Sequence, residues 1–326
     1  MIHNSEGGMM KRIDRSLAAL VPVFSLIFLC CLYSAAGAQE FTGLNDYQMW
    51  AANTGYPQGL LVPMGVDGVN QDYFHTLPGS AGYASGRIVI GDSRSCQQGI
   101  WQNRTGSDDY AVFAVWGGHY ISGTGTPALT PEHLYEIGQC FQEQIRTHGK
   151  CTVFFFATVN DYDYYGNGNS AYIAAAVASA ETIAFMSYEY EGTVYHPDVI
   201  VIGFDGGRRT GDIFGIPQDV FNRYIEIYNT ELRNTVHNSP VLKENASMFT
   251  TVSEITGGKT GFISDGLHYS DSTLQTIAEY MVDFSAGGVP DAEVTVVGKE
   301  PEKTAGTATW GYQNEETPLI FYRIGN

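Results

Sequence analysis

Short apolar segments alternate with longer amphipathic ones along the middle of the chain, from about residue 87 to residue 287. The apolar segments contain much Val, Ile and Phe and are mostly followed by Gly or small polar residues, a pattern typical of buried β-strands. They predict strands over 87–91, 110–116, 152–158, 199–202 and 248–252.

The amphipathic segments predict helices, because their apolar residues recur every three or four positions. The clearest begins after Thr130, an N-cap that precedes Pro131, and ends at Gly149. Its apolar face is formed by Leu134, Ile137, Phe141 and Ile145. Further helices are predicted from near Ser93 and over 172–186, 217–236 and 272–284.

This alternation of strands and helices favours an α/β fold, in which parallel strands form one sheet and helices cover both of its faces. In such sheets, ligands bind where the carboxyl ends of the strands meet. The flanks depart from the pattern. Residues 39–86 predict an irregular lead-in that packs on the domain. Residues 288–326 predict a β-like C-terminal extension, with strand-like runs over 293–297 and 319–322.

The first 38 residues have the layout of a secretory signal peptide. Basic residues from Lys11 to Arg15 precede an apolar run over 17–32, and Ala36-Gly37-Ala38 offers a cleavage site before Gln39. The true start is left open, because Met9 or Met10 would also serve. We expect cleavage and a secreted or cell-envelope protein; the alternative is an uncleaved membrane anchor, because the run approaches the ~20 residues that span a bilayer.

Composition narrows the class of protein. The 326 residues include 17 basic and 35 acidic side chains, a net charge of −18, and 44% are hydrophobic. Cleavage would leave 14 basic and 33 acidic residues and a charge of −19. A chain with this many hydrophobic residues can bury a core, so an intrinsically disordered protein is excluded. The shortage of Lys and Arg argues against nucleic acid and against a stable membrane partner after cleavage; the oligomeric state is left open.

Three cysteines would remain after cleavage: Cys96, Cys140 and Cys151. An odd number allows at most one internal disulfide. Cys140 with Cys151 is the favoured pair, because a helix ends and a strand begins between them, but three buried thiols are equally compatible with the sequence.

Candidate chemistry stands at the ends of four predicted strands. The first strand ends in Gly91-Asp92-Ser93-Arg94, which places a Ser at a helix N-terminus, where positive potential favours a developing oxyanion. The second ends in Gly117-Gly118-His119 and the third in Thr158-Val159-Asn160-Asp161. Asp265-Gly-Leu-His268 follows the fifth. An Asp three residues before a His can orient it as a base for Ser93.

These four motifs, in this order, resemble those of the SGNH (GDSL-type) hydrolases over about residues 87–284. The resemblance implies a three-layer α/β/α sandwich with a flavodoxin-like, parallel five-stranded sheet, and hydrolysis of esters or thioesters. It implies Ser93 as nucleophile, His268 as general base and Asp265 as its orienting carboxylate. The oxyanion hole would comprise Ser93, Gly118 and Asn160. Thr158 replaces the family's Gly, which puts the local backbone approach and the width of the pocket in doubt.

Weaker signals add candidates for substrate binding at the same rim. These are Asp92, Arg94, Gly117, His119, Asp161, Tyr162 and Arg208. The acidic, Asn- and Gly-rich run over 161–169 has some features of a calcium loop, but a solvated active-site loop fits it better. Since metal-ligand motifs such as His-Glu-x-x-His do not occur, we predict no metal and no cofactor.

We therefore expect a secreted serine esterase that hydrolyses short-chain acyl esters, acetyl above all, on a carbohydrate. The grounds for the substrate are the export signal, the acidic body, the tyrosines over 162–165 and the lack of a long apolar lid segment. Two alternatives stay open. One is a lipase or thioesterase acting on lipidic acyl esters; the other is a non-catalytic glycan-binding module on a hydrolase scaffold.

Overall fold

A computed structural model describes residues 73–76, 79–123, 125–161, 169–207, 217–244, 248–287, 308–310 and 322–324. All of them belong to a compact unit from Phe41 to Asn326. Residues 1–38, the predicted signal peptide, lie outside the described residues.

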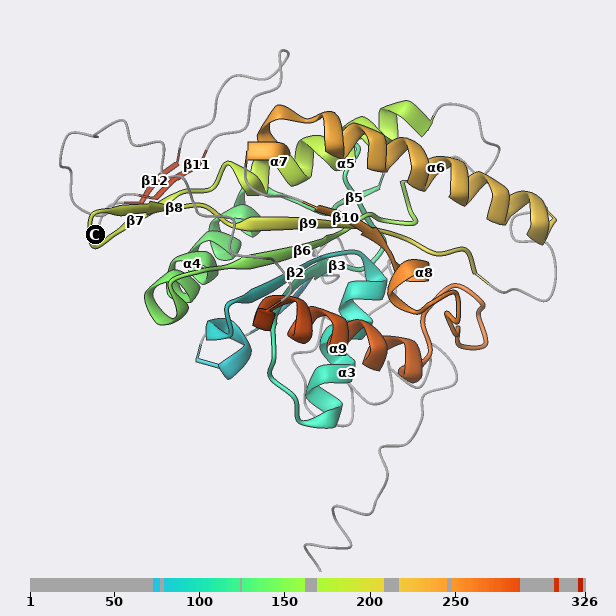
Figure 1. The fold of residues 1–326 in the computed structure, drawn as a ribbon, viewed down its shortest axis with the longest axis horizontal. Coiled ribbons are helices and arrows are strands. Elements are labelled where there is room, and N and C mark those ends of the chain that lie inside the picture. The colour runs from blue at the N-terminus through green and yellow to red at the C-terminus, as the bar shows by residue number, and fades with distance from the viewer. Residues whose placement is uncertain are drawn as a thin grey trace, which may run out of the picture. The chain divides into compact units, whose positions relative to one another are not determined.

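A six-stranded sheet forms the centre of the described unit (Figure 1). Five strands are parallel: β2 (Arg87–Gly91), β3 (Ala111–Val115), β6 (Thr152–Phe156), β9 (Asp198–Gly203) and β10 (Met248–Thr251). In space they run β3-β2-β6-β9-β10. Of these five strands, β2 comes first in the chain, and it lies between the second, β3, and the third, β6. This is the flavodoxin-like order, and it confirms the predicted parallel five-stranded sheet.

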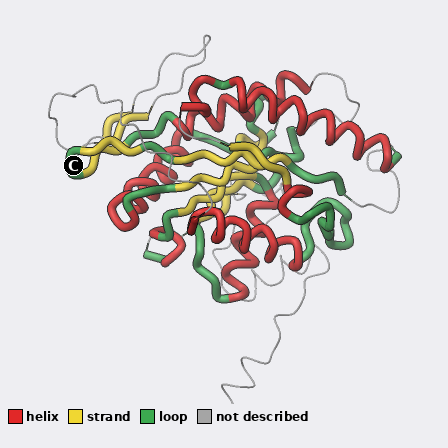
Figure 2. The backbone as a smooth tube through the Cα atoms, viewed as in Figure 1, coloured by secondary structure: helices red, strands yellow, loops and turns green. Residues whose placement is uncertain are grey.

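Helices cover both faces of the sheet (Figures 1 and 2). The first face packs against α4 (Pro131–His148), α5 (Asn169–Ala184), α6 (Gln218–Asn238) and the short α7 (Pro240–Glu244). The second packs against α3 (Ser93–Thr105), α9 (Asp271–Gly287) and the short α8 (Val252–Ile255). The predicted three-layer sandwich is thereby confirmed.

The central strands are apolar throughout because both of their faces are buried. In β2, Ile88 and Ile90 point into the core beneath α4, α5 and α6, whereas Val89 between them points into the core beneath α3 and α9. All three side chains are at most 1% exposed.

The ends of α4 follow the sequence signals. Thr130 accepts a hydrogen bond from the backbone N–H of His133, whose side chain caps Thr130 in return. Gly149 ends the helix in the left-handed conformation, with φ 69°. The boundaries predicted for this helix are confirmed.

The lead-in is less irregular than the sequence predicted. Within it, β1 (Tyr73–His75) pairs antiparallel with β3 and forms one edge of the sheet. A 3₁₀ helix, η1 (Ala81–Ala84), follows, and its Tyr83 joins the core beneath α4. A three-residue strand is too short to show a period, which is why the sequence pattern missed it.

Three further strand pairs lie outside the central sheet. β7 (Tyr188–Tyr190) and β8 (Thr193–Tyr195) form a hairpin whose turn residues Glu191 and Gly192 both have positive φ. β4 (Gly118–His119) pairs with β5 (Thr126–Pro127), and β11 (Ala308–Trp310) with β12 (Tyr322–Ile324). The strand predicted over 293–297 lies outside the described residues, and of 319–322 only Tyr322 is described.

The favoured disulfide prediction was wrong. Cys96, Cys140 and Cys151 are all buried, and none of them forms a disulfide. Cys140 instead donates to the carbonyl of Tyr83 over 3.5 Å and accepts from the Gln144 amide over 3.4 Å. Burial raises the pKa of Cys140 to about 12 and raises that of Cys151 as well. The alternative of three buried thiols holds.

No helix within the described ranges combines the length and the apolar character needed to cross a bilayer.

Candidate active site

The site candidates gather where the sheet reverses its strand order. β2 and β6 are neighbours in the sheet. Between them the chain passes through α3 on one face of the sheet, then β3, then α4 on the opposite face. The crevice at the carboxyl ends of such strands is the usual ligand site of this fold. Ser93 follows β2 there, and Thr158 follows β6.

Three of the predicted residues form one hydrogen-bonded chain. Ser93 is the first residue of α3, and its Oγ lies 2.9 Å from Nε2 of His268. Nδ1 of His268 lies 2.6 Å from Oδ2 of Asp265. Ser93 and His268 are 175 residues apart in the chain, so only the tertiary fold brings them together.

A tight turn holds Asp265 against His268. The other carboxylate oxygen, Oδ1, accepts from the backbone N–H groups of Leu267 and His268, at 2.8 and 2.9 Å. Gly266 adopts φ 69°, which Gly reaches without strain. The loop closes through a bond of 2.9 Å from the N–H of Ile263 to the carbonyl of His268. The Asp-Gly pair therefore explains the local geometry.

Asp265 is held as a carboxylate. Burial alone would raise its pKa, but the hydrogen bond and charge of His268, with the two backbone N–H groups, outweigh burial and lower the pKa to about 2. A carboxylate that accepts from Nδ1–H leaves Nε2 unprotonated, and an unprotonated Nε2 can accept the proton of the Ser93 hydroxyl.

Trp116 is a site residue that the sequence analysis missed. Its ring stacks on the imidazole of His268, with centroids 5.3 Å apart and planes 15° from parallel. Trp116 directly follows β3, at the same rim as the other candidates. Its place at a strand end was the available signal, but a lone Trp does not reveal which distant ring it meets.

Arg94 serves a different purpose from the predicted one. Its side chain is only 4% exposed and reaches into the protein rather than toward a substrate. Nε donates to the carbonyl of Leu267 over 3.1 Å, and Nη1 to the hydroxyl of Tyr269 over 3.0 Å and the carbonyl of Asp205 over 3.3 Å. The guanidinium also lies 4.7 Å from the Tyr269 ring centre. Arg94 thus fixes the segment that carries His268.

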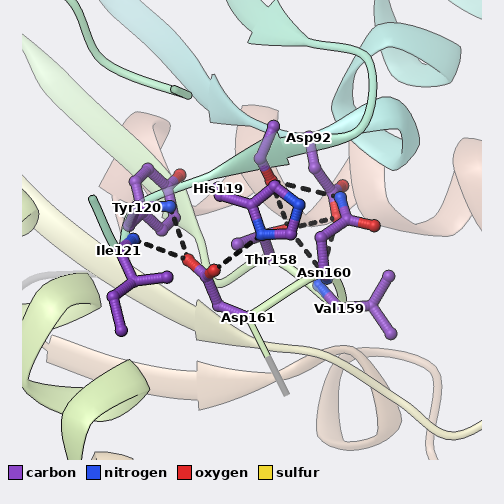
Figure 3. Close-up of polar contacts among 9 residues, drawn as sticks. Asp92, His119, Tyr120, Ile121, Thr158, Val159, Asn160 and Asp161 are labelled. Atoms are coloured by element: carbon purple, nitrogen blue, oxygen red, sulfur yellow. Dashed lines mark hydrogen bonds and ion pairs between the residues drawn. The ribbon is translucent and has the colours of Figure 1, made fainter. Parts of the chain in front are cut away.

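The two other predicted oxyanion donors lie side by side. Nδ2 of Asn160 donates to the carbonyl of Gly118 over 3.1 Å (Figure 3). This bond uses one of the two N–H groups of the amide, and the second is left for a ligand. A Cβ on Gly118 would come within 2.9 Å of both the Cβ and the carbonyl of Val115. The packing therefore requires glycine at 118. Gly117 has φ 67°, so its part in the site is the turn it allows.

Asp92 is also unavailable to a substrate, contrary to its predicted role. It is 1% exposed. Oδ1 accepts from the N–H of Arg94 as the N-cap of α3, and Oδ2 accepts from the N–H of Val159 over 3.1 Å and from the hydroxyl of Thr158 over 2.9 Å. Asp92, which directly precedes Ser93, is thereby bonded to the loop that carries Asn160.

Asp161 likewise points inward rather than toward a substrate. It is fully buried and accepts from Nδ1 of His119 at 2.9 Å, from the N–H of Ile121 at 3.2 Å and from the N–H of Tyr120 (Figure 3). Burial raises its pKa, although these donors oppose the rise. The side chain of His119 keeps 22% exposure, so it remains a candidate for substrate contact.

Two of the predicted substrate-binding residues, Tyr162 and Arg208, lie outside the described residues. No group of three or more His, Cys, Asp or Glu side chains suited to a metal ion occurs in the part of the chain that the structure describes.

Comparison with known proteins returns likenesses of structure alone. No protein-family model matches the chain, and no curated protein matches it either. An aryl esterase of M. smegmatis matches with 16% identity over 62% of this chain and 99% of its own, at a TM-score of 0.38. A carbohydrate acetylesterase from Sinorhizobium meliloti matches with 15% identity over 62% of this chain and 99% of its own, also at a TM-score of 0.38.

A third likeness is to a family 3 carbohydrate esterase of Clostridium thermocellum, with 15% identity over 61% of this chain and 93% of its own, at a TM-score of 0.33. All three of these structures are named as esterases.

Proposed function

We propose that this protein is a serine ester hydrolase that works through an acyl-enzyme on Ser93. The observation that carries the proposal is the continuous hydrogen-bonded chain from Ser93 through His268 to Asp265. A buried Ser at a helix N-terminus, within 2.9 Å of an imidazole that a carboxylate orients, is the arrangement that nucleophilic acyl transfer requires.

In the first half-reaction, Oγ of Ser93 attacks the ester carbonyl carbon while Nε2 of His268 takes the hydroxyl proton. The carbonyl oxygen becomes an oxyanion, and the N–H groups of Ser93 and Gly118 with the second amide N–H of Asn160 would stabilise it. The tetrahedral intermediate then collapses, and His268 returns its proton to the departing alcohol.

In the second half-reaction, a water molecule attacks the acyl group on Ser93 while His268 takes a proton from it. A second tetrahedral intermediate collapses, the carboxylic acid leaves, and Ser93 regains its proton from His268. Asp265 keeps the imidazole in one tautomer and stabilises the imidazolium that forms twice in each turnover.

As substrate we propose a short acyl ester, acetyl above all, on a carbohydrate. The support comes from the sequence: an export signal, an acidic net charge, and tyrosines over 162–165, directly after Asp161. A sugar ring can stack on the rings of these tyrosines. We also propose that the chain is exported and cleaved between Ala38 and Gln39. N-terminal sequencing of the exported protein tests the cleavage, and retention of residues 1–38 would contradict it.

The first experiment is hydrolysis of p-nitrophenyl acetate by residues 39–326, beside the Ser93→Ala variant. We expect turnover by the wild type and at least a 10³-fold lower kcat in the variant, because the nucleophile is gone. Equal rates in the two proteins would reject Ser93, and no activity in either would favour the glycan-binding alternative.

A series of p-nitrophenyl esters from acetyl to octanoyl then tests the acyl group. The proposal expects kcat/KM to be highest for acetyl and to fall with chain length. A preference for octanoyl would favour a lipase or thioesterase instead, while leaving the role of Ser93 intact.

A further inference from the structure

One side chain touches all three segments that converge on the predicted oxyanion hole. Thr158 is fully buried. Its Oγ1 lies 2.9 Å from Oδ2 of Asp92 and 2.9 Å from the carbonyl oxygen of Gly118. It also accepts from the backbone N–H of Asn160 over 3.0 Å. Figure 3 draws Thr158 with Asp92 and Asn160.

The bonding capacity of a hydroxyl matches this environment. It has one proton to share between two acceptors, the Asp92 carboxylate and the Gly118 carbonyl, and a lone pair for the Asn160 N–H. The Gly118 carbonyl also receives the side-chain amide of Asn160, 3.1 Å away. Thr158, Gly118 and Asn160 therefore form a closed triangle that fixes the amide of Asn160 relative to the backbone of Gly118.

The same hydroxyl also fixes this triangle to the nucleophile. Asp92 precedes Ser93 and caps α3, so its bond to Thr158 ties the oxyanion donors to the residue that carries the attacking oxygen. The glycine that the SGNH resemblance places at 158 has no hydroxyl to make these bonds. The hydroxyl of Thr158 instead has three polar partners.

We propose that Thr158 is a positioning residue of the oxyanion hole, which acts through Asn160 and Gly118 without touching the substrate. The inference rests on the proposed function. Displacing donors by even about 1 Å costs up to 10²-fold in rate, because their interaction with the oxyanion depends on their being in place beforehand.

The test compares Thr158→Val, which keeps the shape but removes the hydroxyl, with Thr158→Ser, which keeps the hydroxyl. With p-nitrophenyl acetate we expect Thr158→Val to lower kcat about 10- to 100-fold and to change KM less than about threefold. Thr158→Ser should stay within about threefold of the wild type. Thr182→Val is the matched control, since Thr182 is another buried threonine, whose hydroxyl donates to Ala178 within α5.

A second measurement separates the oxyanion hole from general loss of structure. Phenylboronic acid adds to a serine oxygen to give a tetrahedral anion, so its Ki should rise in Thr158→Val by about the factor lost in kcat. Thr182→Val should keep the Ki and kcat of the wild type, whatever its thermal stability. Should Thr158→Val fail to fold, Thr158→Cys replaces it, because a thiol is a weak donor.

Three results would overturn the inference while Ser93-dependent hydrolysis stands: wild-type kcat in Thr158→Val, a Ser variant as slow as the Val variant, or an unchanged Ki beside a reduced kcat. Failure of the proposed function itself looks different. Then the wild type does not turn over, or Ser93→Ala is as fast as the wild type, and both the function and the role of Thr158 are rejected.

Discussion

Arg94 ties the first turn of α3, the helix that begins at Ser93, to the segment that carries His268. Replacement by Met should leave the carbonyls of Leu267 and Asp205 without a strong buried donor, at a cost of about 3 kcal/mol in the free energy of unfolding. Since the His268 segment would also lose its support, we expect kcat to fall about tenfold or more, with little change in KM. Denaturant unfolding and steady-state kinetics measure the two effects.

Arg146 provides a control for Arg94, because its guanidinium also packs on a tyrosine, Tyr188, and donates to its hydroxyl. It lies on α4, away from the Ser93 motif. Arg146→Met should therefore keep the wild-type kcat. The role of Arg94 would be contradicted if Arg94→Met showed wild-type kcat and stability.

Asn160 offers a direct measurement on the oxyanion hole. Asn160→Ala removes the amide N–H that remains after the bond to Gly118, and we expect kcat to fall by about 10²–10³ with KM nearly unchanged. Asn160→Asp keeps the size of the side chain but adds a negative charge, which would repel the oxyanion. We therefore expect the kcat of Asn160→Asp to be no higher than that of Asn160→Ala. Unchanged turnover in Asn160→Ala would exclude the amide as a donor.

At the residue scale, the sequence indicated which residues meet but not which way each side chain points. Ser93, Asp265 and His268 could be predicted because ordered motifs at strand ends limit where the side chains go. The inward orientation of Arg94 and Asp161 depends on Tyr269 and His119, partners that are distant in the chain. The bonds of Thr158 have the same origin, because a threonine at a loop start does not show that Asp92 and Gly118 converge on it.

At the element scale, the N-terminal cap of α4 predicts a pH effect. Burial lowers the pKa of His133 below its ordinary value of 6.5, so the unfolded chain takes up this proton first as the pH falls. The free energy of unfolding should therefore be highest above about pH 6.5, decrease as the pH falls through that value, and level off below the pKa of the folded state.

His133→Gln isolates this contribution, because glutamine can keep a capping box with Thr130 but does not titrate. Urea unfolding between pH 8 and pH 5 should show a smaller decrease in stability for the variant than for the wild type. Parallel curves for the two proteins would mean that His133 contributes nothing to the pH dependence.

Long elements could be predicted and short ones could not. α4 has 18 residues, a cap at each end and a full apolar face, so its period and its limits both appear in the sequence. β1, β7 and β8 have three residues each, and their strands exist because a neighbour supplies the backbone partners. The failed prediction of a Cys140–Cys151 bond shows the same limit, because proximity in the fold does not determine whether two thiols pair.

At the scale of the whole molecule, the central sheet includes a strand, β1, that precedes Arg87, where the sequence predicted the domain to begin. A chain that begins there lacks β1, which covers the edge of β3, and Tyr83, which is only 9% exposed in the core. We expect residues 87–326 to have a lower Tm than residues 39–326 and to self-associate, because an uncovered strand edge pairs with other chains. Light scattering and thermal unfolding measure both effects.

A chain of residues 73–326 is the control, since it keeps β1 and η1. It should stay monodisperse in the conditions under which residues 39–326 do so. Equal behaviour of the chains starting at 73 and at 87 would show that β1 is dispensable.

The three buried thiols, Cys96, Cys140 and Cys151, bear on how the protein would reach its place of action. Each is sealed in the core, and no covalent bond between them has to form during folding. Among the described residues, the fold therefore does not depend on disulfide formation or on the redox state of the compartment. For a protein that we propose is exported, the rate of folding and the rate of translocation then decide the outcome, and a chain that reaches the membrane late would already be folded on the wrong side of it.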